Sequence, residues 1–363
     1  MDFTPTEEQQ AARELAARIF GDLATPERLA AVGGGSDAEL WKALCAAGLP
    51  EAVEETGLLG LVLLAEEQGR TTAQVPFTAS CAYGLLAVAR HGTEEQRARL
   101  LPGLRDGTTV VTGCFPAAEG QGAVRAAPGG RLTGTVPWVP WLRDATHVLV
   151  PDEDRALWLV RTADTTGPAD PVELTAPWSA GRLVLDGTPG ERLGEGTPGE
   201  RPGGRGAAED PAGTYADVLA AARIAFAGLQ AGVCAGSLAR AVAYTSVREQ
   251  FGRPLSANQA VQLRAADAHM DTESIRVTAY EAAWRYDQGL PAAEHALTAA
   301  WWASEAGKRV VHAGQHLHGG MGADLDHPVH RHFLWGRQLD AYLGCGTELL
   351  AELGDLLAKG EAA

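Results

Sequence analysis

The segment most informative about chemistry runs from Arg248 to Leu255, reads Arg-Glu-Gln-Phe-Gly-Arg-Pro-Leu, and is followed by Asn258-Gln259. It ends one long apolar helix and, across a Gly/Pro turn, begins the next. An arginine can bind an oxyanion through two parallel hydrogen bonds, and the free amides of a helix N-terminus add further donors. The segment therefore predicts an anion site, with a capping arginine in a tight turn as the alternative.

A second segment, His316 to Gly322, reads His-Leu-His-Gly-Gly-Met-Gly and precedes His-Pro-Val-His-Arg at 327–331. A Gly-Gly pair ends a helix and lets backbone approach a ligand closely, although glycine is also the ordinary end of a helix. A rival interpretation is a metal site, because His312 and His316 are one helical turn apart. No nearby cysteine or acidic pattern completes such a site, so no metal is predicted.

Taken together, the two segments resemble the acyl-CoA dehydrogenase family, whose late signatures read roughly R-x-x-F-G-x-x-L, Q-x-x-G-G-x-G and Y-P-V-x-R. The resemblance spans nearly the whole chain and is strongest from Ala220 onward. It implies an FAD cofactor and α,β-dehydrogenation of an acyl-CoA. In that family each FAD lies across a subunit interface, where the arginine and the Gly-Gly turn reach the neighbour's pyrophosphate and adenosine.

Carried over position by position, the resemblance assigns FAD contacts to seven residues of this chain. The family's glutamine, three residues before the first glycine, is replaced here by His316, whose imidazole can still donate one hydrogen bond. The predicted cofactor-binding residues are Arg248, Gln250, Phe251, Leu255, Asn258, His316 and Gly320.

The family's catalytic base has no counterpart in this sequence. Family members remove the substrate α-proton with a glutamate in I-Y-E-G-T, a carboxylate whose pKa can be tuned by desolvation. Counting from Pro328 places Leu343 at that position, and anchoring on Gly346-Thr347 places Cys345 there instead. Glu348 is about a turn further on and faces elsewhere on a helix.

Other departures follow the same pattern. Some relatives carry the glutamate early in the long helix, where this chain has Ala220–Arg223, with Asp217 one and a half turns away. The family's flavin-contacting T-E-P-x-x-G-S loop corresponds to Cys114–Gly120. Its W-I-T segment becomes Trp138–Pro140, which replaces a hydrogen-bonding threonine with a residue that cannot donate. No catalytic residue is therefore assigned to this chain.

The pattern resembles the non-catalytic subunit of the α2β2 heteromeric acyl-CoA dehydrogenases of actinobacterial steroid side-chain degradation, especially the enzyme acting on C5 cholesterol side-chain CoA thioesters. His318-Gly319-Gly320, Asp326–Arg331 and Phe333 carry this likeness. It implies a paralogous partner subunit that supplies the glutamate and holds the acyl-CoA. Two alternatives stay open: a homomeric dehydrogenase with an unusual base such as Asp217 or Glu348, and a flavin-free protein of the same fold.

The elements that must position these residues predict an α+β chain with the acyl-CoA dehydrogenase fold. We expect an N-terminal helical domain at 1–108, a small β-barrel domain at 109–186, a linker at 187–213 and a C-terminal four-helix bundle at 214–363. The linker holds a duplicated Gly-Thr-Pro-Gly-Glu-Arg at 187–192 and 196–201 and is expected to be disordered. Gly228, Gly232 and Gly236 predict close approach of a neighbouring helix.

Composition limits the remaining possibilities. With 363 residues and a net charge of −16, the chain is large enough for several domains and too acidic to favour nucleic acid. Five scattered cysteines fit reduced thiols rather than disulfides. The sequence has no uninterrupted apolar run of about 18 residues, so no membrane span is predicted. The N-terminus does not resemble a signal peptide. A cytoplasmic protein is expected.

Overall fold

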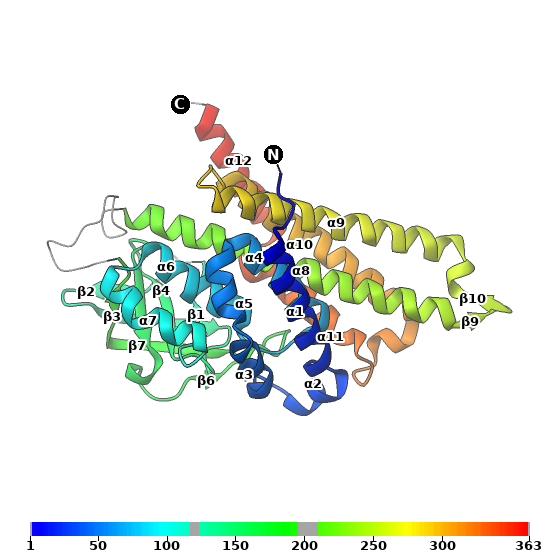
Figure 1. Ribbon diagram of the computed structural model, residues 1–363, viewed down its shortest axis with the longest axis horizontal. Coiled ribbons are helices and arrows are strands. Elements are labelled where there is room, and N and C mark those ends of the chain that lie inside the picture. Colours follow the sequence, from blue (N-terminus) through cyan, green and yellow to red (C-terminus); the bar gives the residue numbers. More distant parts are fainter. Residues whose placement is uncertain (1, 117–122, 195–209, 362–363) are drawn as a thin grey trace. The chain divides into compact units, whose positions relative to one another are not determined.

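The computed structural model describes residues 2–116, 123–194 and 210–361, and its elements run helices, strands, helices, the α+β order that the sequence predicts (Figure 1). The helices are α1 (Glu7–Leu23), α2 (Pro26–Val32), α3 (Ala38–Ala46), α4 (Leu49–Thr71), α5 (Phe77–Ala79), α6 (Ala87–His91), α7 (Glu94–Asp106), α8 (Pro211–Val247), α9 (Gln259–Asp287), α10 (Ala293–Leu317), α11 (Val329–Tyr342) and α12 (Gly346–Glu361).

The chain divides into two compact units. The first comprises Met1–Ala31, Leu58–Ala73 and Arg223–Ala363, and the second comprises Val32–Gly57 and Gln74–Ala222. One boundary falls within α4 at Gly57, whose positive φ of 75° breaks the helix. The finer domain boundaries inferred from the sequence, at 108, 186 and 213, stay a prediction.

Capping residues explain where several helices begin. At the start of α1 the Thr6 hydroxyl accepts the Gln9 N–H at 3.2 Å, and the Gln9 side chain accepts the Thr6 N–H at 2.9 Å. Thr93 and Gln96 repeat this reciprocal arrangement at the start of α7. Each capping box satisfies backbone donors that the first helical turn leaves unpaired.

In the first unit, the glycines of α8 permit the close helix contact that their spacing predicts. A Cβ added at Gly232 would lie 1.9 Å from the Glu66 carbonyl oxygen of α4, and one at Gly236 would lie 2.3 Å from the Arg70 carbonyl. Such separations cannot be accommodated without moving backbone. Gly228 meets the same helix at Val62, so the prediction of a glycine-lined seam is confirmed.

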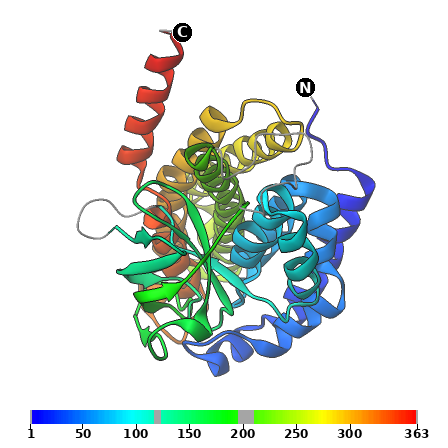
Figure 2. The same ribbon diagram turned by 90° about the vertical axis from the view of Figure 1, so that its left-hand side faces the viewer.

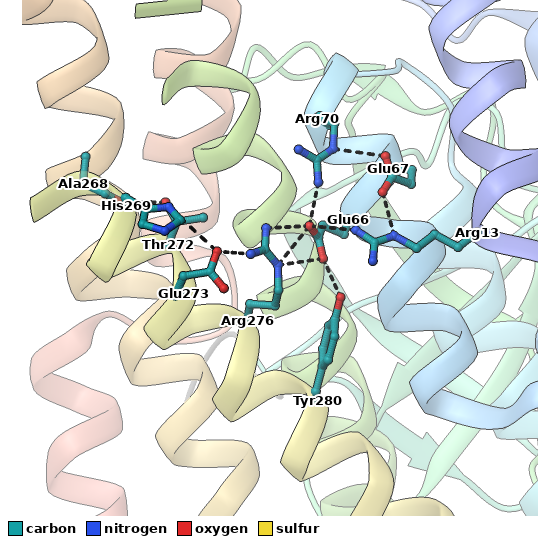
Figure 3. Close-up of polar contacts among 10 residues, drawn as sticks. All are labelled: Arg13, Glu66, Glu67, Arg70, Ala268, His269, Thr272, Glu273, Arg276 and Tyr280. Carbon is teal, nitrogen blue, oxygen red and sulfur yellow. Dashed lines mark hydrogen bonds and ion pairs between the residues drawn. The ribbon is translucent and has the colours of Figure 1, made fainter. Parts of the chain in front are cut away.

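A buried ion network joins α1, α4 and α9 of the first unit (Figure 3). The Glu66 side chain is 0% exposed, and it accepts hydrogen bonds from Arg276 at 2.8 Å, Arg70 at 2.8 Å and Tyr280 at 2.7 Å. Arg13 adds a contact at 3.3 Å. Burial alone would raise the pKa of Glu66, but the bonds and charges of its partners hold that pKa below its ordinary value. The network fixes α9 against α4.

The second unit contains two four-stranded sheets around an aliphatic core (Figure 2). One sheet has the order β1-β4-β5-β8, with β1 parallel to β4, and the other has the antiparallel order β2-β3-β7-β6. Burial alternates along β7, as a sheet with one covered face requires. The strands are β1 (Val111–Gly113), β2 (Arg125–Ala127), β3 (Arg131–Val139), β4 (His147–Pro151), β5 (Leu157–Arg161), β6 (Asp170–Pro171), β7 (Gly181–Pro189) and β8 (Glu191–Arg192).

The linker differs from the expectation. Its first hexapeptide copy, 187–192, is not disordered: it completes β7 and forms β8, where Glu191 pairs with Leu159 of β5. The Glu191 carboxylate also accepts the Gln96 amide at 2.9 Å and pairs with Arg99. These polar partners are distant in the sequence, so the local composition does not predict them. Their contacts order the segment. The second copy, 196–201, lies outside the described residues.

One described helix, Ala212–Val247, is long and apolar enough to cross a membrane by length and composition. Its most apolar window is 94% buried inside the fold, which is the pattern of a core helix.

Candidate functional site

The Arg248 segment forms a tight hairpin between α8 and α9. Strands β9 (Glu249–Gln250) and β10 (Arg253–Pro254) pair antiparallel around a two-residue loop, Phe251-Gly252. Both loop residues have positive φ, 55° and 76°, the signature of a type I′ turn. For a non-glycine residue this conformation costs about 1 kcal/mol. Phe251 accepts that strain with a fully exposed ring, so nothing in its own chain explains an aromatic residue there.

Backbone bonds fix the hairpin and leave its polar side chains outside. The Arg248 N–H donates to the Tyr244 carbonyl at 2.9 Å, and the Arg248 carbonyl accepts the Leu255 N–H at 2.8 Å. The side chains of Arg248 and Gln250 are exposed, and Leu255 is half-buried. The side-chain oxygen Oδ1 of Asn258 caps α9 by accepting the Ala260 N–H at 3.0 Å.

Helix α9 has no acidic residue in its first turn. Its N-terminal partial positive charge is therefore not neutralised by a neighbouring carboxylate of that turn.

Gly320 and His316 lie at the other end of the predicted site. Gly320 belongs to the short helical turn Gly319–Ala323 that follows α10, and a Cβ added to it would meet nothing within 4 Å. Its φ is not positive, so neither conformation nor packing within the chain requires glycine there. His316, in the last turn of α10, is exposed. An exposed glycine with no internal role suits a backbone that a ligand approaches.

An aromatic stack connects the end of α8, which precedes the hairpin, with the turn that contains Gly320. Tyr244, one turn before Arg248, stacks on His318 with ring centroids 4.8 Å apart and planes 21° apart. The His318 ring donates through Nδ1 to the Gly314 carbonyl at 2.7 Å, which fixes its orientation. The end of α8 and the Gly-Gly turn are therefore neighbours. A guanidinium, a helix N-terminus and an exposed ring chemically fit a pyrophosphate and an adenine.

Leu343, at one of the positions predicted for the family's base, contacts Arg223. Leu343 follows α11 and is 5% exposed, and its carbonyl accepts a hydrogen bond from Arg223 Nε at 3.3 Å. The same guanidinium binds both carboxylate oxygens of Glu352 on α12, at 2.8 and 2.7 Å. Arg223, the last residue of the stretch Ala220–Arg223, and Leu343 are therefore in contact.

The space around this pair is small. A cavity of about 20 Å³ is lined by residues of α8, α10, α11 and α12, which is enough for about one water molecule. Phe226 and Tyr342 pack edge to face beside it, with ring centroids 4.8 Å apart. No acyl chain fits there without rearrangement.

Asp217 and Glu348, the two acids considered as alternative catalytic bases, contact other groups of the chain. Asp217 accepts a contact from His91 Nε2 at 2.7 Å and pairs with Arg90 at 3.1 Å. Glu348 is exposed and accepts the Cys345 N–H at 3.0 Å, which caps the start of α12. These contacts give both carboxylates local structural roles.

In the second unit, Phe115, in the segment predicted to correspond to the family's flavin loop, is buried. Phe115 lies between Tyr83 and Tyr215, with centroid distances of 5.1 and 5.5 Å and nearly parallel planes. All three rings are buried. The Pro140 carbonyl accepts the Thr112 hydroxyl at 2.6 Å. The rest of the loop, 117–120, lies outside the described residues.

The histidine-rich segment is arranged for packing. His312 contacts Phe333 edge to face at 4.9 Å. Among the described residues, no group of three or more His, Cys, Asp or Glu side chains is placed to hold a metal ion. The described cysteines are all free thiols, and burial raises the pKa of Cys81, Cys114 and Cys234 well above its ordinary value.

Three features of these sites were not identified from the sequence. Arg223 was noted only as a non-acidic residue, and its pairing with Glu352 joins positions 129 residues apart. The Phe115 stack likewise combines distant segments. Tyr244 could have been found, because it lies four residues before Arg248 and therefore on the same helix face.

This architecture matches known proteins. The chain matches the acyl-CoA dehydrogenase N-terminal domain over residues 6–108 and the acyl-CoA dehydrogenase C-terminal domain over residues 214–352. It is 34% identical to acyl-CoA dehydrogenase FadE27 of Mycobacterium tuberculosis, with all of both chains covered. The chain belongs to the acyl-CoA dehydrogenase family.

Two solved structures are similar to this chain over nearly its whole length. The chain is similar to a variant of the Tcur3481–Tcur3483 steroid ACAD, with a TM-score of 0.88, 39% identity and coverage of 98% of this chain and 99% of that one. It is also similar to the ChsE4–ChsE5 complex of Mycobacterium tuberculosis, with a TM-score of 0.87, 33% identity and 99% coverage of both chains. FAD is the family's cofactor, and solved structures of this fold include FAD complexes.

Proposed function

We propose that this chain is the non-catalytic subunit of a heteromeric, FAD-dependent acyl-CoA dehydrogenase. A paralogous partner subunit supplies the catalytic glutamate and holds most of the acyl-CoA. This chain contributes contacts to the pyrophosphate and adenosine of the partner's FAD. The substrate class is a steroid side-chain CoA thioester, which becomes α,β-unsaturated.

The observation that carries the proposal is the occupied base position. Leu343 is one of the two positions, with Cys345, at which the resemblance places the family's glutamate; its carbonyl is bound by Arg223, and the cavity beside it holds about 20 Å³. A guanidinium paired with Glu352 cannot remove a proton from carbon, because it has no basic lone pair at neutral pH. The chain therefore needs a carboxylate from another subunit to take part in dehydrogenation.

The exposed hairpin supports the cofactor role. Arg248 and Gln250 offer donors beside the N-terminus of α9, and Phe251 offers a ring face. When bound, FAD supplies the acceptor for the substrate β-hydride. Arg248 would neutralise phosphate charge, Phe251 would cover an apolar ring, and the open backbone at Gly320 would allow close approach.

The partner and the substrate class rest on the relatives. Both solved relatives carry two-component names, and one is described as a steroid ACAD. The small volume beside Leu343, about 20 Å³, favours a partner that holds the acyl chain, since an acyl-CoA must enter a larger pocket near a base.

Assembly with a paralogous subunit that carries the family's glutamate tests the proposal. The complex should oxidise a steroid side-chain CoA thioester, and replacing the partner's glutamate by glutamine should lower turnover by about 10³-fold or more. A matched complex with Leu343→Gln in this chain should retain turnover within a few-fold. Persistent turnover after loss of the partner's glutamate would contradict the proposal, because the base would then lie in this chain.

A further inference from the structure

The second unit contains a cavity of about 440 Å³, lined by the segment after β3, the segment that connects β5 to β6, and strand β7. Its volume lies within the range of small-molecule pockets, about 300–1,000 Å³. Close packing at Gly181 joins these segments, because a Cβ added there would lie 2.9 Å from the Ala169 Cβ and 3.2 Å from a Leu142 methyl group. The cavity is therefore built by tight contacts between segments that are distant in the sequence.

Apolar residues form part of the cavity wall. Leu142 and Ala145 are buried, and Leu142 belongs to the aliphatic core of the unit. Val184 of β7 also lines the cavity and is 37% exposed. Covering this surface with the hydrocarbon part of a ligand would remove apolar area from water, which favours binding.

Arg143 lines the same cavity and is held in place by neutral acceptors. Its Nε donates to the Ala180 carbonyl at 3.2 Å, and its Nη2 donates to the Gly34 carbonyl at 3.1 Å. Among the described residues it forms no ion pair, so no carboxylate neutralises its charge. A guanidinium has five N–H donors, and three of them stay available here. Because two bonds already hold the side chain, binding an anion would cost little side-chain entropy.

The other polar groups of the cavity differ from Arg143. Arg182 of β7 lies opposite Asp170 of β6 in the strand register and forms an ion pair with it. The Thr166 hydroxyl is exposed and forms no hydrogen bond within the described residues, so it can donate to a ligand. The cavity therefore offers one fixed, unneutralised cation and one free hydroxyl beside an apolar wall.

We infer that this cavity binds a small organic carboxylate, with its carboxylate on the Arg143 guanidinium and its hydrocarbon part against Leu142 and Val184. A planar guanidinium matches a carboxylate through two parallel hydrogen bonds. An inorganic oxyanion would leave the apolar wall uncovered. The lining includes neither Trp138–Pro140 nor the hairpin at Arg248, so the site is separate from these predicted flavin contacts, and the inference does not depend on the proposed function.

Ligand-observed NMR of the full chain, titrated with benzoate and with hexanoate, tests the site. Both should show saturable binding with a dissociation constant of about 1 mM, the order expected for ligands of so few atoms. Acetate lacks the apolar body, benzamide lacks the charge and inorganic phosphate lacks the hydrocarbon, so each should bind about 10-fold more weakly or worse. Absence of saturable binding of benzoate and hexanoate by about 10 mM, or equal binding of phosphate, would overturn the inference.

Variants locate the binding. Arg143→Gln should weaken benzoate binding about 10–100-fold. The matched control Arg131→Gln removes an exposed arginine of β3 that also donates to a carbonyl, and it should leave the binding unchanged.

A second pair of variants leaves the bonds of Arg143 intact, so it tests the site even if Arg143→Gln fails to fold. Thr166→Glu should weaken benzoate binding about five-fold relative to its neutral counterpart Thr166→Gln, because the added carboxylate repels the ligand. Equal benzoate binding by these two variants, or by Arg143→Gln and the wild type, would place the ligand elsewhere and refute the site.

Discussion

The buried carboxylate of Glu66 is expected to be essential for the stability of the first unit. Its side chain is 0% exposed, whereas those of its partners Arg13, Arg70 and Arg276 are 23%, 37% and 21% exposed. Glu66→Gln preserves volume but leaves three clustered guanidinium groups without their central anion. Breaking a buried pair by removing one partner costs about 3–5 kcal/mol. Because the arginines reach solvent, the lower end, about 3 kcal/mol, applies here.

Differential scanning fluorimetry can measure this cost. For a chain of this length, about 3 kcal/mol corresponds to a midpoint lowered by about 4 °C. The matched control is Glu55→Gln, an exposed glutamate of α4, which should shift the midpoint by less than about 1 °C. Since the pKa of Glu66 is lowered in the folded state, its stabilising contribution is complete above the unfolded carboxyl pKa and is lost as pH falls below that value. Equal midpoints for wild type and Glu66→Gln at neutral pH would refute the reasoning.

Three further predictions concern the cofactor contact, the base and the buried imidazole. Arg248→Ala should weaken FAD retention by the complex about 10–100-fold in dissociation constant, measured by flavin release on dilution, because it removes a charge-assisted phosphate contact. Asp217→Ala and Glu348→Ala should each leave steady-state turnover within a few-fold, and a loss of several orders of magnitude would identify a base in this chain. Burial lowers the pKa of His332 to about 4, so stability should be complete above the unfolded histidine pKa of about 6.5 and fall between that pH and pH 4. In His332→Gln, urea unfolding should show a smaller loss over this range, and an unchanged pH dependence would count against the assignment.

The order of elements was predictable because it depends on local patterns. The glycine spacing of α8 predicted a close helix contact before any partner was known, and α4 supplies that contact at Val62, Glu66 and Arg70. Helix starts such as Thr6 were visible for the same reason, since a capping box is complete within four residues.

Features that depend on distant segments were not predictable. The 187–192 copy of the hexapeptide is locally a turn-rich sequence, and it becomes ordered because Gln96 and β5 lie beside it. The pairing of Arg223 with Glu352 and the stacking of Phe115 are likewise long-range contacts. A single sequence names the residues at the predicted base position, but not the distant side chains that contact them.

The predicted cofactor-binding residues were identified from the sequence, but their surroundings were not. Family resemblance selected Arg248, Phe251 and Gly320, and the structure adds that the hairpin ring is fully exposed and that the glycine has open space around it. Their contact with FAD stays a prediction.

We propose that this chain completes a flavin site and does not perform dehydrogenation alone. The most direct measurement is the flavin content and acyl-CoA dehydrogenase turnover of the purified chain, compared with those of its complex with a glutamate-bearing paralogous subunit. We predict a flavin-poor, inactive chain alone, and an active complex with one FAD for each pair of subunits. Stoichiometric FAD and turnover from the chain alone would contradict the account.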